Sequence, residues 1–218
     1  MKISRLSKIG IFNTIRLNYH YFGLDGIRHL YFLASRNLKI LSCKGSVIAN
    51  CPMSRGMIQI GFNDVTIFDK KYERSIWKND GNIYLDGHVT IGHGGRISNS
   101  GNIYFGKNFI LNANSTIACQ NEIRFGADNL VSWDCLIMDT DFHKIMPISR
   151  DTVLNAPKRI SIGNHVWIGC RTTILKGSSV KDNSVIAAGS IITSDFDENN
   201  IIIGGVNRVL NKNITWDM

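Results

Sequence analysis

The chain has 218 residues, 44% of them hydrophobic and 19% charged, and its formal net charge is +8. A chain of this length and composition can bury one sizeable core, so we expect one structural domain with appendages. No apolar stretch approaches membrane-spanning length, and no signal-peptide pattern opens the sequence. The five cysteines form no CxxC pair and no metal-like spacing with histidine, so we expect reduced thiols, no bound metal and a cytoplasmic location.

Residues 1–37 are expected to form a short helical segment. Their apolar residues recur at helical spacing and the pattern breaks near Gly23 to Gly26, which predicts one or two short amphipathic helices. Much of the excess positive charge falls on seven residues at this end of the chain: Lys2, Arg5, Lys8, Arg16, Arg28, Arg36 and Lys39. The basic face is either a solvated surface of a helix that caps the fold or a peripheral contact with anionic lipid at the inner face of the membrane. No base-reading motif accompanies the charge, so we expect no nucleic-acid partner.

Residues 38–200 follow a period of six that neither a helix nor an ordinary strand explains. Six aliphatic residues occur at an unbroken six-residue spacing: Ile162, Ile168, Ile174, Val180, Ile186 and Ile192. This period predicts a chain that winds round a triangular prism, with one inward anchor on each face. A small residue two places before the next anchor, such as Ser178 or Ser184, lets the chain turn each corner. The sequence therefore predicts a parallel β-helix.

The same step can be followed upstream, where paired anchors mark units of about twenty residues. The pairs are Leu38/Ile40, Ile58/Ile60, Ile83/Leu85, Ile103/Phe105, Ile123/Phe125 and Ile160/Ile162. They indicate about seven coils, stacked about 4.8 Å apart as strands are in sheets. The polar stretch from Asp69 to Asn79 is expected to form a surface loop, and residues 201–218 are expected to form a C-terminal tail.

A longer interruption, residues 138–158, contains Asp139, Asp141 and His143 in one short cluster. A long loop ejected from an otherwise compact coil usually has a function or is disordered. Because the loop carries this cluster of titratable residues, we expect it to be functional.

Several short motifs resemble the hexapeptide-repeat acyltransferases, in the branch that holds maltose, galactoside and capsule or O-antigen O-acetyltransferases. They are Ile162-Gly-Asn-His-Val-Trp-Ile-Gly169, Ile174-Leu-Lys-Gly177, Val185-Ile-Ala-Ala-Gly-Ser190 and Gly204-Gly-Val206. The resemblance covers about residues 80–212. It implies a left-handed parallel β-helix, a homotrimer with active sites between subunits, acetyl-CoA as donor and a carbohydrate as acceptor. The left hand comes from the resemblance alone, because crossovers in proteins are usually right-handed.

The resemblance also implies roles for individual residues. The motif Asp139-Thr-Asp-Phe-His143 matches the loop of the family's catalytic histidine. The pantetheine arm of the donor would lie beside Trp167, Cys170, Ala188 and Thr193, and its phosphates near Arg208. The acceptor-side asparagine falls at Asn112, with Asn114 as the alternative. Where the family usually has proline after the Gly-Val pair, this chain has Asn207, and this departure affects the placement of Arg208.

Acetyl transfer to a hydroxyl requires a base, because an alcohol is a poor nucleophile until its proton is removed. Histidine suits this task, so His143 is the candidate base and an exposed loop histidine is the alternative reading. Asp139, Asp141 or a backbone carbonyl can orient the ring, and Asn112 or a backbone N–H can donate to the oxyanion. Cys135 falls at an inward corner position, so we expect direct transfer without an acetyl-cysteine intermediate.

These residues together predict an acetyl-CoA-dependent O-acetyltransferase that acts on a sugar hydroxyl of a bacterial surface polysaccharide, such as capsule or O-antigen, or of its precursor. One alternative is an N-acetyltransferase of an amino sugar nucleotide. Such enzymes often carry a separate nucleotide-binding domain before the helix, and the forty or so residues here are too few for one. The other alternative is a non-catalytic β-helix scaffold, which would not bind CoA.

Overall fold

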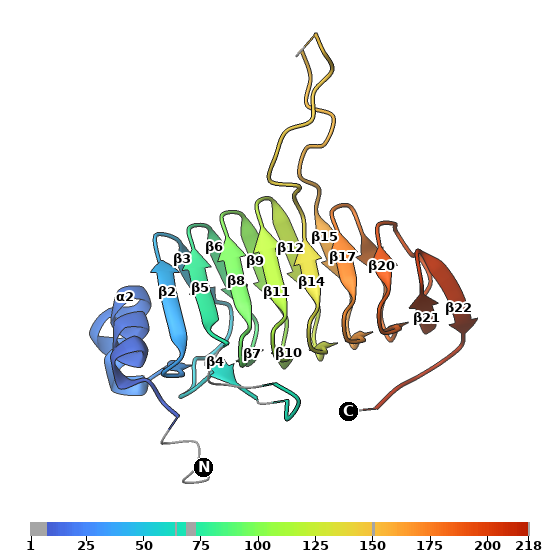
Figure 1. Ribbon diagram of the computed structural model, residues 1–218. Helices are drawn as coiled ribbons and strands as arrows, with labels where there is room; N and C mark the ends of the chain where they lie inside the picture. The colour runs from blue at the N-terminus through green and yellow to red at the C-terminus, as the bar shows by residue number, and fades with distance from the viewer. Residues whose placement is uncertain (1–7, 64, 69–72, 150, 218) are drawn as a thin grey trace.

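The computed structural model describes residues 8–63, 65–68, 73–149 and 151–217. The chain winds into a stack of coils whose strands form three parallel sheets along the faces of a prism (Figure 1). The architecture is the predicted left-handed parallel β-helix, with a helix at its N-terminal end and one long loop projecting from its side. No helix in the described part of the chain combines the length and hydropathy needed to cross a bilayer.

The largest sheet has nine strands, which all run parallel except the last. They are β1 (Phe32–Ala34), β4 (Ile58–Phe62), β7 (Val89–Gly92), β10 (Phe109–Leu111), β13 (Leu130–Val131), β16 (Trp167–Ile168), β19 (Val185–Ile186), β21 (Ile201–Gly204) and β22 (Arg208–Lys212). The final strand, β22, folds back antiparallel to β21.

The other two faces hold seven and six parallel strands. The seven-stranded sheet contains β2 (Leu38–Ser42), β5 (Ser75–Asn79), β8 (Arg96–Asn99), β11 (Thr116–Cys119), β14 (Leu136–Met138), β17 (Thr173–Leu175) and β20 (Ile191–Ile192). The six-stranded sheet contains β3 (Ser46–Ala49), β6 (Asn82–Leu85), β9 (Asn102–Phe105), β12 (Glu122–Phe125), β15 (Ile160–Ile162) and β18 (Ser179–Val180).

The six-residue period corresponds to one inward side chain per strand. The six predicted anchors lie one each on β15 to β20, and all are buried in the single core cluster. Anchors on successive coils face each other in register, as Ile168 faces Ile186 and Ile174 faces Ile192. The small residues before the anchors are buried too, among them Ser178 and Ser184, because each fits inside a corner. The prediction of one anchor per face is confirmed.

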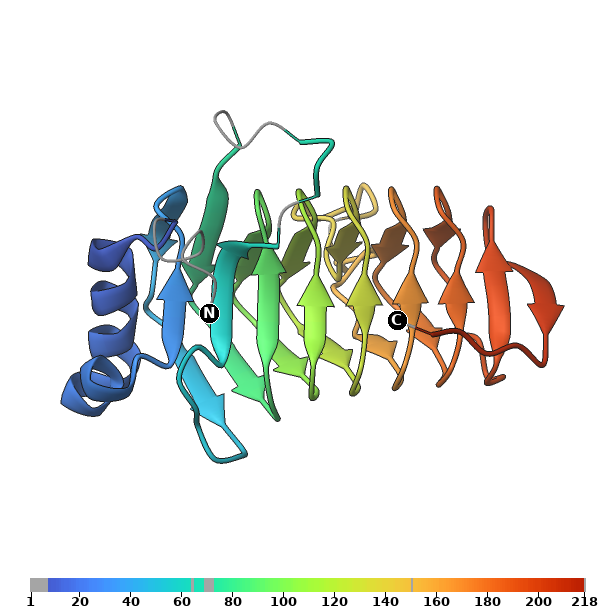
Figure 2. The ribbon, with the colours of Figure 1, turned by 90° about the horizontal axis from the view of Figure 1, so that it is seen from below.

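Helix α2 (Ile11–His29) lies across the N-terminal end of the stack (Figure 2). Gly23, with φ 59° and ψ −142°, breaks it at the predicted place. On the inner side the amide of Asn18 pairs with both backbone groups of Phe32, at 2.9 and 3.0 Å. The indole Nε1 of Trp77 donates to the hydroxyl of Tyr21 at 3.0 Å, and burial raises the pKa of that hydroxyl. The helix is therefore held to the first two coils by buried polar contacts as well as by packing.

Both expected boundaries of the β-helix differ from the structure. Strand β1 begins at Phe32, inside the predicted helical segment 1–37, and pairs with β4. At the other end, β21 continues the stack by pairing in parallel with β19, although residues 201–218 were expected to be a tail. Ile201 and Ile203 are buried anchors, but Ile201 lies nine positions after Ile192, so a strict period of six misses them.

The paired anchors at the N-terminal end were also assigned to the wrong faces. Leu38/Ile40 lies on β2 and Ile58/Ile60 on β4, whereas the later pairs lie in the six-stranded sheet. The excursion between β3 and β4 lengthens one of these coils, and it was not predicted. Of the stretch from Asp69 to Asn79, which was expected to be a loop, residues 69–72 lie outside the described residues and Ser75–Asn79 form β5. A spacing near twenty does not show on which face a pair lies.

Candidate active site

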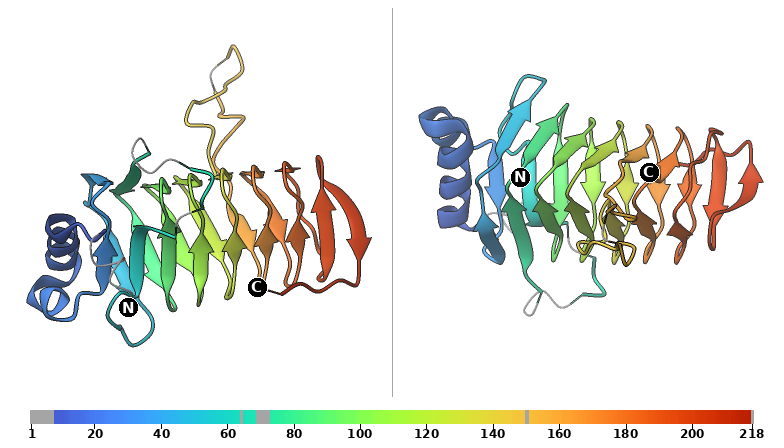
Figure 3. Two further views of the ribbon diagram at one scale, coloured as in Figure 1. Left: turned by 60° about the horizontal axis from the view of Figure 1, so that its bottom comes forward. Right: turned by 90° about the horizontal axis from the view of Figure 1, so that it is seen from above.

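The long loop leaves the stack between β14 and β15 and projects far from it (Figures 1 and 3). It starts at the corner between the seven-stranded and six-stranded sheets, which we call the loop corner; Lys176 and Thr193 lie at the same corner on later coils. The loop exposes several large apolar side chains: Phe142, Ile145, Met146, Ile148, Val153 and Leu154. Such a cluster on a projecting arm is typical of a surface that another molecule covers.

His143 lies near the start of this loop and is exposed. Its backbone N–H donates to the carbonyl of Asp141 at 2.7 Å, and its carbonyl accepts from Nδ2 of Asn155 at 2.8 Å. Within the described residues its imidazole makes no hydrogen bond or ion pair. The backbone at His143 is thus held by hydrogen bonds, while its ring is available to contact a bound molecule.

Asn155 and Lys176 hold the two arms of the loop together. Nδ2 of Asn155 also donates to Oδ2 of Asp141 at 2.8 Å, and its Oδ1 accepts from the backbone N–H of Ile145 at 2.6 Å. Lys176 forms an ion pair with Asp141 and donates to the carbonyl of Asn155 at 2.8 Å. Hydrogen bonding to Lys176, and then to Asn155, lowers the pKa of Asp141 below its usual value.

Asp139 is fully buried and fixes the point where the loop leaves the stack. Its carboxylate accepts from the backbone N–H groups of Gln120 and Asn121, at 2.7 and 2.8 Å. The thiol of Cys119 donates to it at 3.4 Å, and burial followed by this nearby charge raises the pKa of Cys119. Among the described contacts, neither Asp139 nor Asp141 touches the ring of His143, contrary to the expectation that one of them orients it.

Three of the other predicted site residues lie at a different corner. Asn112, Cys170 and Ala188 follow β10, β16 and β19, at the junction of the nine-stranded and seven-stranded sheets, which we call the Ala188 corner. The backbone packs closely here: N–H of Gly189 donates to the carbonyl of Cys170 at 2.8 Å. A Cβ on Gly169 would lie 2.6 Å from N of Ala188. Gly169, Cys170 and Ala188 thus form a strip of small residues on adjacent coils, with Ala188 exposed.

The two candidate asparagines differ in their surroundings. Asn112 is half-buried, and its backbone N–H donates to Val131 at 2.9 Å. Asn114 has a φ of 58°, and in the described structure its buried Oδ1 has no hydrogen-bond partner. The outward, partly accessible side chain makes Asn112 the better candidate for contact with a substrate.

Trp167 lies on β16 and is 39% exposed. Its Nε1 donates to the hydroxyl of Ser132 at 3.0 Å, which fixes the ring. The C-terminal Trp216 stacks on His165 with ring centroids 4.2 Å apart and lies 6.1 Å from Trp167. This contact could not be predicted from the sequence, because a single tryptophan in a polar tail belongs to no periodic pattern.

Thr193 and Asn207 form a clamp at the C-terminal end. The side-chain oxygen of Asn207 accepts from the backbone N–H of Thr193 at 2.8 Å, and its Nδ2 donates to the Thr193 hydroxyl at 2.6 Å. Asn207 stands where the resembled family usually has proline, so a side-chain clamp replaces a rigid ring. Arg208 follows it, exposed at the start of β22.

A basic pocket of about 540 Å³ opens at the loop corner. Its cations are Lys158, Arg159, Lys176 and Lys181; Asp195 and Asp197 also line it, and Asp197 lies 4.0 Å from Nζ of Lys181. Lys158 and Lys176 lie one coil apart, since N–H of Gly177 donates to the carbonyl of Arg159 at 3.2 Å. Their spacing of 18 residues, three periods of six, is a signal that could have revealed this cluster. Within the described residues no group of three or more His, Cys, Asp or Glu could hold a metal ion.

Comparison with known proteins supports this description. Residues 159–194 match the model of the family described as bacterial transferase hexapeptide (six repeats). The chain is 35% identical to the galactoside O-acetyltransferase of Escherichia coli K12 over 49% of this chain and 52% of that protein. It is 39% identical to the polysialic acid O-acetyltransferase of Neisseria meningitidis over 30% of this chain and 31% of that protein. The chain thus spans about half, or less, of the length of these relatives.

A solved structure shares the fold over a longer stretch. The crystal structure of the polysialic-acid-specific acetyltransferase NeuO aligns with a TM-score of 0.59 at 20% identity. The alignment covers 85% of this chain and 74% of that one. The repeat match, the homologous O-acetyltransferases and this shared architecture confirm the resemblance read from the sequence. The chain thus resembles the hexapeptide-repeat transferases in the repeat of residues 159–194, in parts of its sequence and in its fold.

Proposed function

We propose that this protein is an acetyl-CoA-dependent O-acetyltransferase that modifies a sugar hydroxyl of a bacterial surface polysaccharide, capsule or O-antigen, or of its precursor. The observation that carries the proposal is an exposed histidine, His143, whose backbone is tied on both sides while its ring is left available. The homologous galactoside and polysialic acid O-acetyltransferases support a carbohydrate hydroxyl as the acceptor.

In the proposed reaction His143 acts as general base. A ring nitrogen takes the proton from the sugar hydroxyl as its oxygen attacks the thioester carbonyl of acetyl-CoA. The amide of Asn112 donates to the tetrahedral oxyanion. When the intermediate collapses, the carbon–sulfur bond breaks and the imidazolium returns the proton to the departing CoA thiolate. The acetyl group then stands on the sugar oxygen.

Cys135 takes no part in this proposal. Its thiol is buried and donates to the carbonyl of Gly169 at 3.2 Å, and burial raises its pKa to about 11. A thiol in such a setting is a poor nucleophile near neutral pH, because the reactive form is the thiolate. Direct transfer in a ternary complex is therefore the simpler route.

The active site is proposed to form between subunits of a homotrimer. His143 projects from the loop corner, whereas Asn112 and Ala188 lie at the Ala188 corner of the same chain. A loop that reaches a neighbouring chain would bring the two halves together and would cover the exposed apolar residues on the loop. The donor would then lie along Trp167, Cys170, Ala188 and Thr193 of the neighbour, with its phosphates near Arg208.

The test of the catalytic role is His143→Ala beside the exposed control His88→Ala. We expect His143→Ala to lower acetyl transfer by about 10²–10⁴-fold, with CoA binding and the melting temperature unchanged. CoA release with sugar acceptors and the acetyl content of surface polysaccharide, measured by mass spectrometry, report the loss. Near-normal activity in this variant would refute the role, and an absence of CoA binding by the wild type would favour a non-catalytic scaffold.

The shared site has its own test, in which two inactive subunits are co-expressed. His143→Ala removes the base, and Ala188→Trp blocks the strip proposed for the donor. If each site draws one half from each neighbour, mixed trimers regain about a quarter of wild-type activity, because the halves combine at random. A site contained within one subunit would give no recovery.

We also propose that the enzyme works in the cytoplasm at the inner face of the membrane, where a polymer or lipid-linked acceptor would be found. The concentration of positive charge near the N-terminus supports this location.

A further inference from the structure

Helix α2 carries apolar side chains that are exposed and are not part of the core. Its inner face, with Leu17, Asn18 and Tyr21, is taken up by the end of the stack. On another side Phe12, Ile15 and Tyr19 follow one another at helical spacing and are exposed, Phe12 by 78%. Ile11, exposed by 70%, adjoins this row, and Leu24, exposed by 78%, follows the break at Gly23. We call these five residues the apolar ridge.

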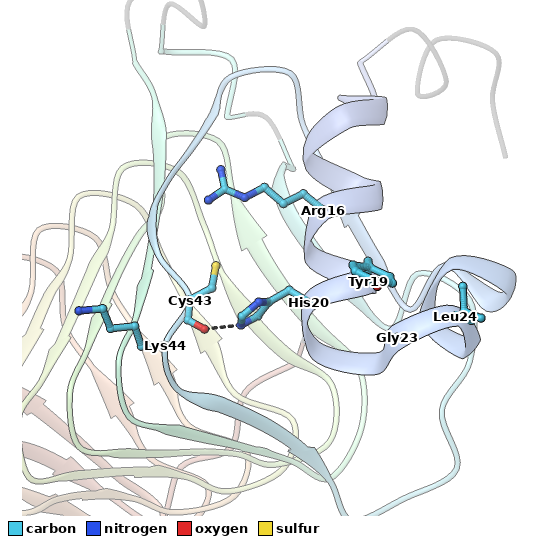
Figure 4. Close-up of a pocket in the computed structure, with 7 residues that line it drawn as sticks. All are labelled: Arg16, Tyr19, His20, Gly23, Leu24, Cys43 and Lys44. Carbon is cyan, nitrogen blue, oxygen red and sulfur yellow. Dashed lines mark hydrogen bonds between the residues drawn. The ribbon is translucent and has the colours of Figure 1, made fainter.

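A pocket of about 800 Å³ opens beside the ridge, between α2 and the turn after β2. Tyr19 and Leu24 of the ridge line it together with Arg16, His20 and Lys44 (Figure 4). The ring of His20 contacts the carbonyl of Cys43, which holds this wall in place. Apolar side chains suited to insertion into a membrane thus lie next to cations suited to binding an anion.

The excess positive charge is concentrated in the N-terminal part of the sequence. The first 40 residues hold seven of the 25 Lys and Arg residues but only one of the 17 Asp and Glu residues. That acid, Asp25, accepts from the hydroxyl of Tyr31 at 2.6 Å and pairs with His29, so its charge is partly offset. The rest of the chain is nearly balanced, and of the seven cations Lys8, Arg16, Arg28, Arg36 and Lys39 are among the described residues.

We infer that α2 is a docking helix for an anionic lipid surface. The apolar ridge enters the boundary between headgroups and acyl chains, and the pocket with Arg16 and Lys44 receives a lipid phosphate. A second copy of this chain is a poorer occupant, because a self-complementary contact would bring the cations of both copies together. In a side-by-side trimer the capped ends of the three chains would face the same way, so three docking helices would bind one surface.

Flotation with vesicles tests the inference, using phosphatidylcholine alone and phosphatidylcholine mixed with phosphatidylglycerol. We expect the wild type to bind the mixed vesicles and to bind more weakly at high salt. The double variant Phe12→Ser/Ile15→Ser should lose at least tenfold in binding, and so should Arg16→Gln/Lys44→Gln. All four side chains are exposed, so circular dichroism and the melting temperature should stay unchanged.

Matched controls remove similar groups elsewhere on the chain. Val209→Ser/Leu210→Ser deletes exposed apolar residues at the opposite end, and Arg159→Gln/Lys181→Gln deletes cations of the loop corner. Both should bind as the wild type does. The inference is overturned if the wild type does not bind mixed vesicles, or if the ridge variant binds them normally.

Two further outcomes would also overturn it. If inorganic phosphate alone competes fully with vesicles and the ridge variant is unaffected, the pocket takes a soluble anion instead of a lipid. If the ridge variant lowers the mass of the wild-type particle without changing vesicle binding, the ridge contacts another copy.

Discussion

The ammonium group of Lys176 forms an ion pair with the carboxylate of Asp141, and this pair ties the corner after β17 to the first arm of the long loop. Asn155 completes the junction from the second arm, by bonds to Asp141 and to the carbonyl of His143. The proposed base is therefore positioned through its backbone and the neighbouring loop by residues that make no hydrogen bond to its ring, and their effect on catalysis can be separated from their effect on the fold.

Replacing Lys176 with methionine should disturb this junction. We expect kcat to fall about tenfold to a hundredfold, because small displacements of a catalytic group are costly. The melting temperature should change little, since surface ion pairs add little to stability. Lys181→Met is the matched control, because Lys181 lines the same basic pocket but has no contact with the loop among the described residues. Equal losses in both variants would assign the effect to the charge of the pocket, and Lys176→Arg should restore part of the activity.

Asp139 and Asp141 should respond differently to conversion to asparagine. Asp139 is buried and accepts from two backbone N–H groups, so Asp139→Asn should lower the free energy of unfolding by about 1.5–3 kcal/mol. Asp141 is exposed, so Asp141→Asn should lower kcat at nearly unchanged stability. Urea unfolding and initial rates on the same preparations separate the two effects. A loss of activity in Asp139→Asn with no loss of stability would contradict the structural role.

Cys135 should make folding sensitive to alkaline pH. Its pKa in the folded state is raised to about 11 from the ordinary 9.0. Below pH 9 both states keep the proton and the stabilisation is complete; above pH 9 the unfolded chain ionises first, so stability falls as pH rises towards 11. The urea midpoint should therefore drop between pH 8 and 10 by more in the wild type than in Cys135→Ala. An equal drop in both, or a burst of free CoA that Cys135→Ala abolishes, would contradict this assignment.

Gly101 marks a corner where the backbone of successive coils is too close for a side chain. A Cβ on Gly101 would lie 2.3 Å from the carbonyl oxygen of Asn121, and one on Gly81 would lie 2.1 Å from that of Gly101. Gly101→Ala should lower the free energy of unfolding by about 1–3 kcal/mol. Ser100→Ala, at the exposed neighbouring position, serves as the control in the same denaturant titration. Equal stability of the two variants would show that the corner can relax.

The anchors from Ile162 to Ile192 could be predicted because each coil repeats the same local requirement. Each face requires a buried residue and each corner a small one, so the sequence shows a period of six. The first coils could not be placed, because excursions of irregular length shift Leu38 and Ile58 onto other faces. The C-terminal boundary was wrong for a similar reason, since the connection from Ile192 to Ile201 is longer than the repeat.

The sequence indicates candidate site residues but not how they are arranged. The motif around His143 indicates chemistry, yet the partners of Asp139 are backbone groups of the preceding coil, about twenty residues away. A contact with backbone N–H groups does not depend on which residues supply them, so it leaves no pattern in the sequence. The clamp between Asn207 and Thr193 was equally hidden, because an asparagine in place of proline reads only as a departure.

Both ends of the stack are capped, and this affects self-assembly. Side chains of α2 occupy backbone groups at the end of the stack: Asn18 binds both groups of Phe32, Thr14 those of Ala34, and Asn13 the carbonyl of Leu38. At the other end β22 runs opposite to the coils. An exposed strand edge is a template for further strands, and a β-helix with open ends would polymerise into fibres. The helix and the reversed strand act as terminators, so the stack stays at a defined length.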